Sequence, residues 1–177
     1  MYRVFTFLVL IPVLVFAQEN KKEDVWKNFR FFEGTWEGTG AGEPGTSTVH
    51  REYQFVMNGT FLSVRNTSTY APQEKNPRGE LHEDWGMFSR DKARKLFVLR
   101  QFNKEGFVNQ YIIDTLHSDS TALVFMTESI ENIPAGWRGK ETYRFLNGNE
   151  FVETFQLAAP GKDFEVYSEA RLKRTKK

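Results

Sequence analysis

Five ionisable side chains fall among apolar neighbours in stretches whose residues alternate as they do in β-strands. Successive side chains of an extended chain point to opposite sides, so these charges share a face with aromatic and aliphatic residues. The five residues are Arg51, Arg100, Glu128, Glu141 and Glu153. Burying a lone charge is strongly unfavourable. We therefore expect each of them to be paired, hydrated or matched to a ligand.

Three kinds of chemistry fit such a set. In the first, the charged side chains pair with one another around a few internal waters and have a purely structural role. An arginine, helped by Tyr53 or Tyr111, would hold the carboxylate or another polar end of an apolar ligand. A carboxyl group with a raised pKa would serve as a general acid or base, and the candidates are Glu128, Glu141 and Glu153. The sequence leaves these three interpretations open.

Residues 80–86 bring one histidine close to three carboxylates. In an extended strand, His82 and Asp84 project to the same side. A metal ion needs a further ligand, and neither His50 nor His117 lies at a spacing that supplies one. We therefore predict no metal site here, expect surface and turn chemistry, and keep His82 as a candidate acid or base.

Asn109 and Tyr111 share a face of another strand-like stretch. An amide and a phenol in such positions either bond to each other or orient a ligand. The complete set of candidate ligand-binding residues is Arg51, Tyr53, Arg100, Asn109, Tyr111, Glu141, Tyr143 and Glu153. The sequence holds no Gly-x-Ser-x-Gly motif, phosphate-binding loop or zinc-helix motif, so no catalytic residue is assigned beyond these candidates.

Strand-like stretches follow one another from residue 34 to the end of the chain, separated by turn residues. They cover residues 34–40, 47–56, 60–70, 82–91, 95–102, 107–114, 121–131, 136–146, 150–157 and 164–174. Asn58-Gly59 and Asn147-Gly148 are strong signals for two-residue hairpins. Ten strands with short connections predict an all-β fold, a closed antiparallel up-and-down barrel.

Ahead of these strands, residues 20–32 have the pattern of an amphipathic helix. Val25, Phe29 and Phe32 fall on one face of it, with Trp26 beside them. We expect this short N-terminal helix to pack on an open end of the barrel.

The start of the sequence has the pattern of a secretory signal peptide. Arg3 precedes an apolar run, Val4 to Phe16, that is too short for a permanent membrane span. The chain has no cysteine, which excludes disulfides and a lipidated-cysteine anchor. A secreted or periplasmic protein without a membrane anchor is therefore predicted. The expected segments are the signal peptide at 1–17, an N-terminal segment with the helix at 18–33 and the barrel at 34–177.

Charge and composition narrow the choice of partner. The sequence holds 24 Lys and Arg against 23 Asp and Glu, a balance that argues against nucleic acid or an anionic membrane as partner. Its 17 Phe, 4 Trp and 6 Tyr supply a large core without disulfides. We expect the partner to be a small apolar or amphipathic molecule. The oligomeric state does not follow from the sequence.

The first strand carries a motif that resembles the opening strand of secreted lipocalin-like (calycin-type) barrel proteins of uncharacterised function: Gly34-Thr35-Trp36-Glu37-Gly38-Thr39-Gly40. The closing basic stretch, Glu169 to Arg174, resembles their last strand. The resemblance covers about residues 24–174 and implies a lipocalin-like barrel. It also implies that Arg171 or Arg174 packs over the ring of Trp36 as a cation–π contact.

More distantly, the chain resembles nitrobindin-type heme-binding barrels, which hold heme through a histidine late in the chain. This sequence has no histidine after His117, and its last strands offer Tyr143 and Tyr167 instead. Heme is therefore disfavoured, no heme ligand is assigned and no cofactor is expected.

Taken together, the sequence predicts an exported, non-enzymatic barrel that holds a largely apolar ligand with a polar or carboxylate end. This function requires an internal cavity of roughly a few hundred cubic ångströms. The alternative is a small barrel enzyme, an isomerase or hydrolase, that uses an internal glutamate as general acid or base. That enzyme needs a carboxylate that is free of any arginine and within reach of the cavity. A third alternative is an interaction module with a solid core and an exposed aromatic patch.

Overall fold

The computed structural model describes residues 24–74 and 76–177 of the chain. The predicted signal peptide at 1–17 and the start of the predicted helix, at 20–23, lie outside the described residues. Among the residues described, no helix is long and apolar enough to cross a membrane.

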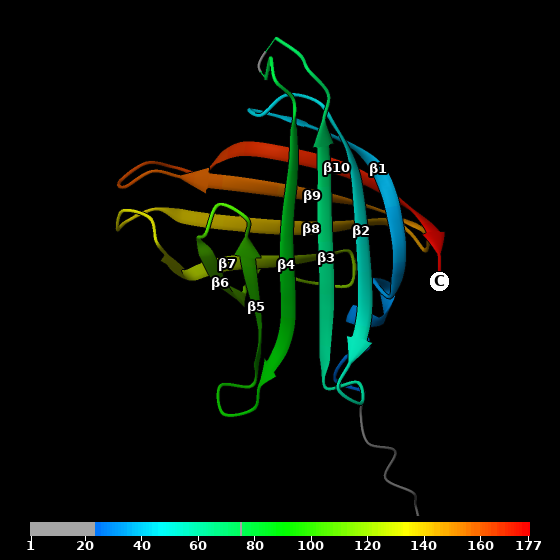
Figure 1. Cartoon of the computed structure of the whole chain (residues 1–177). Helices are drawn as coiled ribbons and strands as arrows, with labels where there is room; N and C mark the ends of the chain where they lie inside the picture. Colours follow the sequence, from blue (N-terminus) through cyan, green and yellow to red (C-terminus); the bar gives the residue numbers. More distant parts are fainter. Residues whose placement is uncertain (1–23, 75) are drawn as a thin grey trace, which may run out of the picture.

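Ten antiparallel strands form a closed barrel in which every strand pairs with its neighbours in the sequence (Figure 1). The ring is completed by β1, which pairs with β2 on one side and with β10 on the other. The predicted all-β up-and-down barrel is confirmed. The strands are β1 (Gly34–Gly42), β2 (Ser47–Val56), β3 (Phe61–Tyr70), β4 (Glu80–Asp91), β5 (Leu96–Asn103), β6 (Val108–Ile113), β7 (Ala122–Glu131), β8 (Arg138–Asn147), β9 (Glu150–Ala158) and β10 (Glu165–Lys176).

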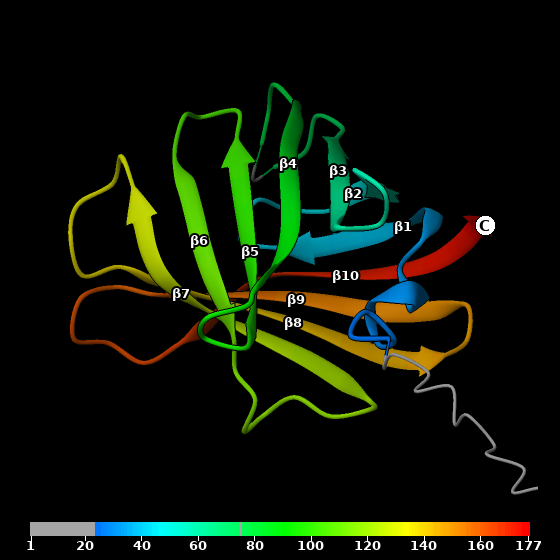
Figure 2. The ribbon, with the colours of Figure 1, turned by 90° about the horizontal axis from the view of Figure 1, so that it is seen from below.

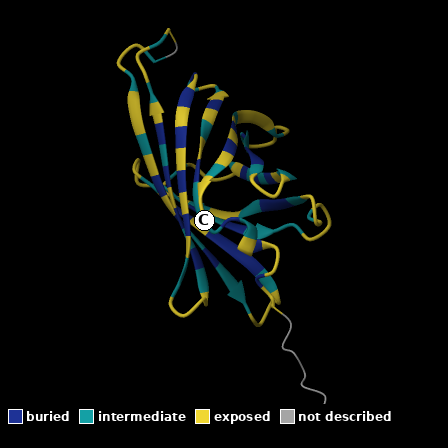
Figure 3. Cartoon of the chain, turned by 90° about the vertical axis from the view of Figure 1, so that its right-hand side faces the viewer, coloured by how far each residue is buried: buried dark blue, intermediate teal, exposed yellow. Residues whose placement is uncertain are grey.

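Buried and exposed residues alternate along much of each strand, as the colours of Figure 3 show. In β2, Ser47, Val49, Arg51 and Tyr53 are buried, and the residues between them are exposed. This alternation follows from the pleat of the strand, because one face looks into the barrel and the other into solvent. The inward residues of each strand therefore define what the lumen contains.

The segment before β1 is a series of tight turns and not an α-helix. Its regular element is η1, a 3-10 helix at Phe29–Phe31, and Phe32 N–H donates to the Phe29 carbonyl at 3.0 Å. The helix predicted for residues 20–32 is therefore wrong over its described part, 24–32.

The spacing of the aromatic residues explains this difference. Trp26, Phe29 and Phe32 recur at every third residue, which is the period of a 3-10 turn, and all three are buried. Val25, which an α-helix would place with them, is 49% exposed. Because all three rings must enter the barrel, the tighter turn is favoured over the α-helix.

These rings fill one half of the barrel. Phe29 lies 4.3 Å from Phe97 between ring centroids, and Phe32 stacks on Tyr53 at 5.0 Å. Figure 2 views the barrel from below and shows the segment before β1 lying across the ends of β8 and β9. The buried aromatic residues of this cluster, here called the aromatic plug, are Trp26, Phe29, Phe32, Trp36, Phe88, Phe97, Phe125 and Phe151.

The pairing of β1 with β10 closes the barrel and depends on two residues of β1. Trp36 lies opposite Arg174 in the register, and its ring is fully buried. At Gly38, a Cβ would collide with the carbonyl oxygen of Arg171, so the absence of a side chain permits the close approach of the strands.

Arg174 joins the aromatic plug to the closing strand. Its guanidinium carbon lies 4.0 Å from the centroid of the Trp36 ring, which is the contact that the resemblance implies. The same guanidinium donates hydrogen bonds to the carbonyl oxygens of Glu33 and Phe31. Arg174 thus fixes the segment before β1 against the last strand.

We predict that Arg174→Ala lowers the free energy of unfolding by about 2–4 kcal/mol, because it removes a cation–π contact and charge-assisted hydrogen bonds. Arg171 is the matched control, since its exposed side chain pairs with Glu150 on the outer surface. Arg171→Ala should cost less than about 1 kcal/mol. Urea unfolding measures both values, and equal losses would contradict the special role of Arg174.

Candidate functional site

The half of the lumen beyond the aromatic plug is hollow. It holds a cavity of about 610 Å³, bordered at one end of the barrel by residues of the β1–β2, β5–β6 and β7–β8 connections. Its apolar walls include Val49, Phe107, Ile130, Trp137, Phe155 and Leu157. A cavity of a few hundred cubic ångströms, as the binding function requires, is therefore present.

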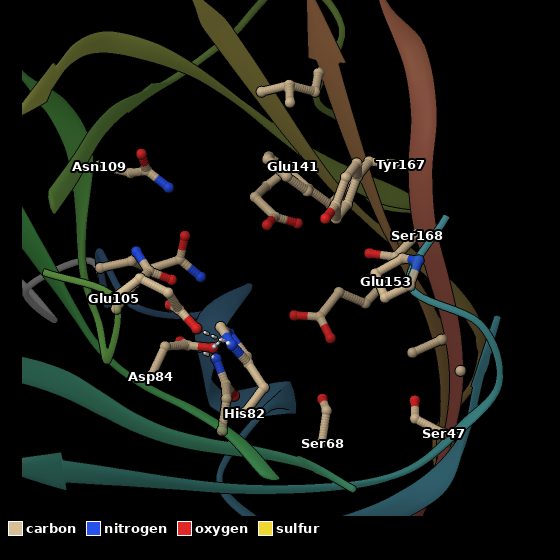
Figure 4. A pocket seen from close by; sticks show the side chains of 18 of the residues that line it. Ser47, Ser68, His82, Asp84, Glu105, Asn109, Glu141, Glu153, Tyr167 and Ser168 are labelled. Carbon is tan, nitrogen blue, oxygen red and sulfur yellow. Dashed lines mark hydrogen bonds and ion pairs between the residues drawn. The ribbon is translucent and has the colours of Figure 1, made fainter. Parts of the chain in front are cut away.

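The inward residues of neighbouring strands form layers across the lumen. Next to the aromatic plug lie three buried tyrosines, Tyr53, Tyr111 and Tyr143. Two residues further along each strand, toward the opening, lies a layer of buried polar groups, here called the polar layer. It consists of Arg51, Asn66, Asp84, Gln101, Asn109, Glu141 and Glu153. Figure 4 shows several of these side chains pointing into the cavity.

Arg100, which the sequence interpretation placed in the lumen, lies outside it. Its exposed side chain donates a hydrogen bond to Ser89 Oγ at 3.2 Å. Both faces of β5 carry apolar residues, so the residue pattern alone does not show which face points into the barrel. Phe97 and Leu99 turn inward to the core instead, which puts Arg100 on the outer wall.

Glu128 is likewise wrongly predicted to face the lumen. It pairs with Arg94 at 2.5 Å and accepts a hydrogen bond from Gln110 at 2.9 Å on the outer surface. The pairing of β6 with β7 shifts register at Gln110, and this irregularity reverses the alternation along β7. Phe125 faces the core before it, and Ile130 faces the cavity after it.

The other candidates come together as predicted from alternation. Those that line the cavity are Arg51, Asn109, Tyr111, Glu141 and Glu153. Tyr53 and Tyr143 lie buried directly beneath them. Sequence reasoning missed Asn66, Ser68 and Gln101. Asn66 and Ser68 continue the inward series of β3, so the alternation of that strand contained the signal.

Arg51 is held by a buried ion pair. Its Nε donates to Glu153 Oε2 at 3.1 Å, and its Nη1 donates to the Thr67 carbonyl at 3.1 Å and to Ser68 Oγ at 3.3 Å. Burial opposes the charged form of Arg51, but the charges of Glu153 and Asp84 outweigh it and hold the pKa of Arg51 above its ordinary value. Arg51 is therefore a cation whose partner is built into the protein.

Asp84 is a buried carboxyl group that no Arg or Lys of the described residues pairs with. Asn66 Nδ2 donates to its Oδ1 at 2.6 Å, and His82 Nε2 lies 3.8 Å from its Oδ2. Burial raises the pKa of Asp84 to about 6, although Arg51 and the hydrogen bond from Asn66 act in the opposite direction. Asp84 thus takes up a proton in mildly acidic solution.

Glu141 stands apart from the ion pairs of the polar layer. Among the described residues, its buried Oε2 has no hydrogen-bond partner, and the same is true of the hydroxyl of Tyr53. Burial, and then the charges of Glu153 and Asp84, raise the pKa of Glu141 well above its ordinary value. The environment of Glu141 therefore favours the protonated, neutral form of its carboxyl group, and Oε2 is not used by the protein.

Asn109 and Tyr111 bond to each other. Asn109 Nδ2 donates to the Tyr111 hydroxyl oxygen at 3.0 Å within the buried wall. Of the two alternatives that the sequence offers for this pair, the structure shows mutual bonding.

A histidine and two carboxylates gather at the rim of the cavity. Glu80, His82 and Glu105 place one potential ligand atom each within 4.8 Å of one another. His82 Nδ1 lies 3.0 Å from Glu105 Oε1, so these two side chains already pair. The sequence did not reveal Glu105 as a neighbour of His82, because the two residues are 23 positions apart and meet through the β4–β5 pairing. Such a trio has the donor types of a metal site but lies largely exposed.

Comparison with known proteins supports the fold. The sequence matches no family model and no curated protein. Among solved structures, the crystal structure of Rv2717c from M. tuberculosis is similar, with a TM-score of 0.62, 17% identity, and 85% of this chain and 96% of that chain covered. A de novo designed fluorescence-activating β-barrel shares 10% identity over 82% of this chain and 95% of its own, with a TM-score of 0.40.

The likeness to Rv2717c shows a shared barrel fold. At 17% identity it extends to the fold alone. The TM-score of the designed barrel is too low to carry an argument.

We predict that Asp84→Asn changes the pH dependence of stability. Because the pKa of Asp84 is about 6 in the folded protein against an ordinary value of 3.8, the folded state binds an extra proton between these values, and stability falls as pH rises through this window. Asp84→Asn removes this titration, so the variant does not lose stability in this window. The free energy of unfolding of the variant minus that of the parent should therefore rise by roughly 3 kcal/mol at most from pH 4 to pH 7.

Urea unfolding at intervals across this pH range measures the difference between the two proteins. Asp91→Asn is the control, because hydrogen bonds from the backbone and side chain of Arg94 lower the pKa of Asp91. Its relative stability should change with pH in the opposite direction. A flat difference for Asp84→Asn would contradict the prediction.

Proposed function

We propose that this chain is an exported small-molecule-binding barrel. One observation carries the proposal: a cavity of about 610 Å³ whose inner wall is a polar layer with an unpartnered carboxyl group, that of Glu141. Cavities of roughly 300–1,000 Å³ with apolar walls and a few convergent polar groups are typical of small-molecule sites. The aromatic plug supplies the core, so the hollow half is not needed for it.

The walls and the inner end of the cavity suit different parts of one ligand. Phe107, Trp137 and Leu157 offer apolar surface near the opening, which fits a largely apolar body. Glu141 offers a hydrogen-bonding group at the inner end, which fits a polar group. The ligand is therefore amphipathic and enters with its polar end first.

A carboxylate is the less favourable polar end. Arg51 already binds Glu153, and Arg100 lies outside the barrel. A carboxylate at the inner end would meet Glu141 and Asp84 with no free cation to balance it. A neutral or positively charged polar group fits this site better.

Export and the absence of macromolecular partners belong to the same proposal. Export rests on the signal-peptide pattern of residues 1–17, and secreted and periplasmic locations both fit it. The balance of 24 basic and 23 acidic residues speaks against nucleic acid and anionic membranes as partners.

Native mass spectrometry of the protein from its own host tests for a co-purified molecule, and a cavity-filling variant tests the location. Leu157→Trp places a large side chain in the cavity wall. We expect it to weaken binding of the neutral dye N-phenyl-1-naphthylamine by about tenfold or more, since the dye and the indole compete for one volume. Dye fluorescence measures the dissociation constant.

Gln156→Trp is the matched control. Gln156 precedes Leu157 on β9 and its side chain faces the opposite side of the sheet. Its variant should bind the dye as the parent does. Equal binding by all three proteins would place the dye outside the lumen and count against the proposal.

A small barrel enzyme is the second candidate, and Glu141 is the observation that favours it. Glu128 and Glu153 are both ion-paired, to Arg94 and Arg51. Glu141 has no arginine in contact, lines the cavity and has a raised pKa, which are the features of a general acid.

The two candidates predict different behaviour toward a chromogenic ester such as p-nitrophenyl butyrate. The binding proposal expects hydrolysis at equal rates with the parent, Glu141→Gln and the outer-wall control Glu128→Gln. A rate that falls about 100-fold in Glu141→Gln and not in Glu128→Gln would favour the enzyme instead. Steady-state absorbance measurements decide between them.

A further inference from the structure

The charges that face the cavity are unbalanced, although those of the chain are not. The whole sequence has a net charge of +1. The carboxyl groups of lining residues that face the cavity are those of Glu80, Asp84, Glu105, Glu141 and Glu153. Glu169 borders the cavity too, but its side chain is exposed and accepts a hydrogen bond from Thr154 on the outer face. The basic lining residues are Arg51 and His82. Carboxyl groups therefore outnumber basic groups around this one cavity.

The polar layer accounts for only one of its carboxylates by an ion pair. Arg51 balances Glu153 at 3.1 Å, and Asn66 bonds to Asp84. Glu141 is left without a partner, although its side chain is only 6% exposed. Unpartnered polar groups at such burial are uncommon in folded proteins and call for an explanation.

The arrangement in space gives that explanation. Figure 4 shows the carboxyl groups of Glu141 and Glu153 pointing toward the same region of the cavity, with Asp84 and His82 across from them. A cation in this region would have a carboxyl group on either side. A cation would be attracted by the carboxyl groups around it, a neutral group would gain less from them, and an anionic group would be repelled.

We propose that the ligand of this cavity is an amphipathic organic cation, an amine whose ammonium group binds at Glu141 within the polar layer. The inference rests on the proposed binding function and names its ligand class. An alkyl or aryl body then lies against Phe107, Trp137 and Leu157. A metal ion would leave a cavity of about 610 Å³ and its apolar walls unfilled.

Binding of such a cation displaces a proton. In the empty cavity, burial and the charges of Glu153 and Asp84 raise the pKa of Glu141 and so favour its protonated form. An ammonium group beside it favours the ionised form, so Glu141 releases its proton to solvent as the amine binds. The charged groups that face Glu141 and modulate this step are Arg51, Asp84 and Glu153, together with the hydroxyls of Tyr53, Tyr111 and Tyr143.

Three probes with the same aromatic body test the proposal. They are 2-(1-naphthyl)ethylamine, 2-(1-naphthyl)ethanol and 1-naphthylacetate, which are cationic, neutral and anionic at pH 7. We expect the amine to bind at least about tenfold more tightly than the alcohol, and the acetate more weakly still. Isothermal titration calorimetry of the full chain in two buffers of different ionisation enthalpy measures the affinities and the released proton.

Glu141→Gln should reduce amine binding about tenfold, abolish proton release and leave alcohol binding unchanged, because the amide keeps the shape and loses the charge. Glu128→Gln is the matched control on the outer wall and should behave as the parent. The comparison of the three probes on the parent stands even if the variant does not fold.

Equal binding of amine and alcohol, or preference for the acetate, would overturn the cation proposal. If the probes then bound to the parent but not to Leu157→Trp, they would occupy the cavity, and the proposed binding function would stand. Amine binding that is unaffected by Glu141→Gln would also overturn the proposal. Failure of all three probes to bind at millimolar concentration would overturn it and remove support for the binding function as well.

Discussion

The hydrogen-bonded pairing of β1 with β10 is the constraint on which the rest of the structure depends. It joins the two ends of the barrel, since Arg174 contacts residues more than 140 positions earlier in the chain. Closure leaves no free strand edge, and it fixes which face of every strand looks inward. Once the faces are fixed, Arg51, Glu141 and Glu153 must meet at one level of the lumen.

The lumen then divides into two halves with opposite properties. In one half, Trp26, Phe29 and Phe32 enter from outside the barrel and complete a dense aromatic core. In the other, buried charges surround an open volume of about 610 Å³. The three tyrosines lie at the border, where their rings pack in the core, and the hydroxyl of Tyr111 bonds to Asn109 of the polar layer.

Regular alternation made much of this arrangement predictable. Arg51, Glu141 and Glu153 were placed correctly because β2, β8 and β9 each have one clearly apolar face. Arg100 was misplaced because β5 is apolar on both faces, and Glu128 because a register shift interrupts β7. The approach of Glu105 to His82 depends on how neighbouring strands pair, and so does the partner of each buried charge. The residue pattern of a single strand does not contain this information. The likeness to Rv2717c adds support for the barrel and not for its contents.

The separation of core and cavity has a consequence for the history of such a protein. Substitutions among the residues around the open half disturb few of the contacts that hold the barrel together, so natural selection is free to alter them. On the proposed binding function, such a barrel would acquire new ligands through a handful of changes while its scaffold persists. Descendants of one ancestral barrel would then keep the indole, its covering guanidinium and the buried rings, and diverge in what they carry.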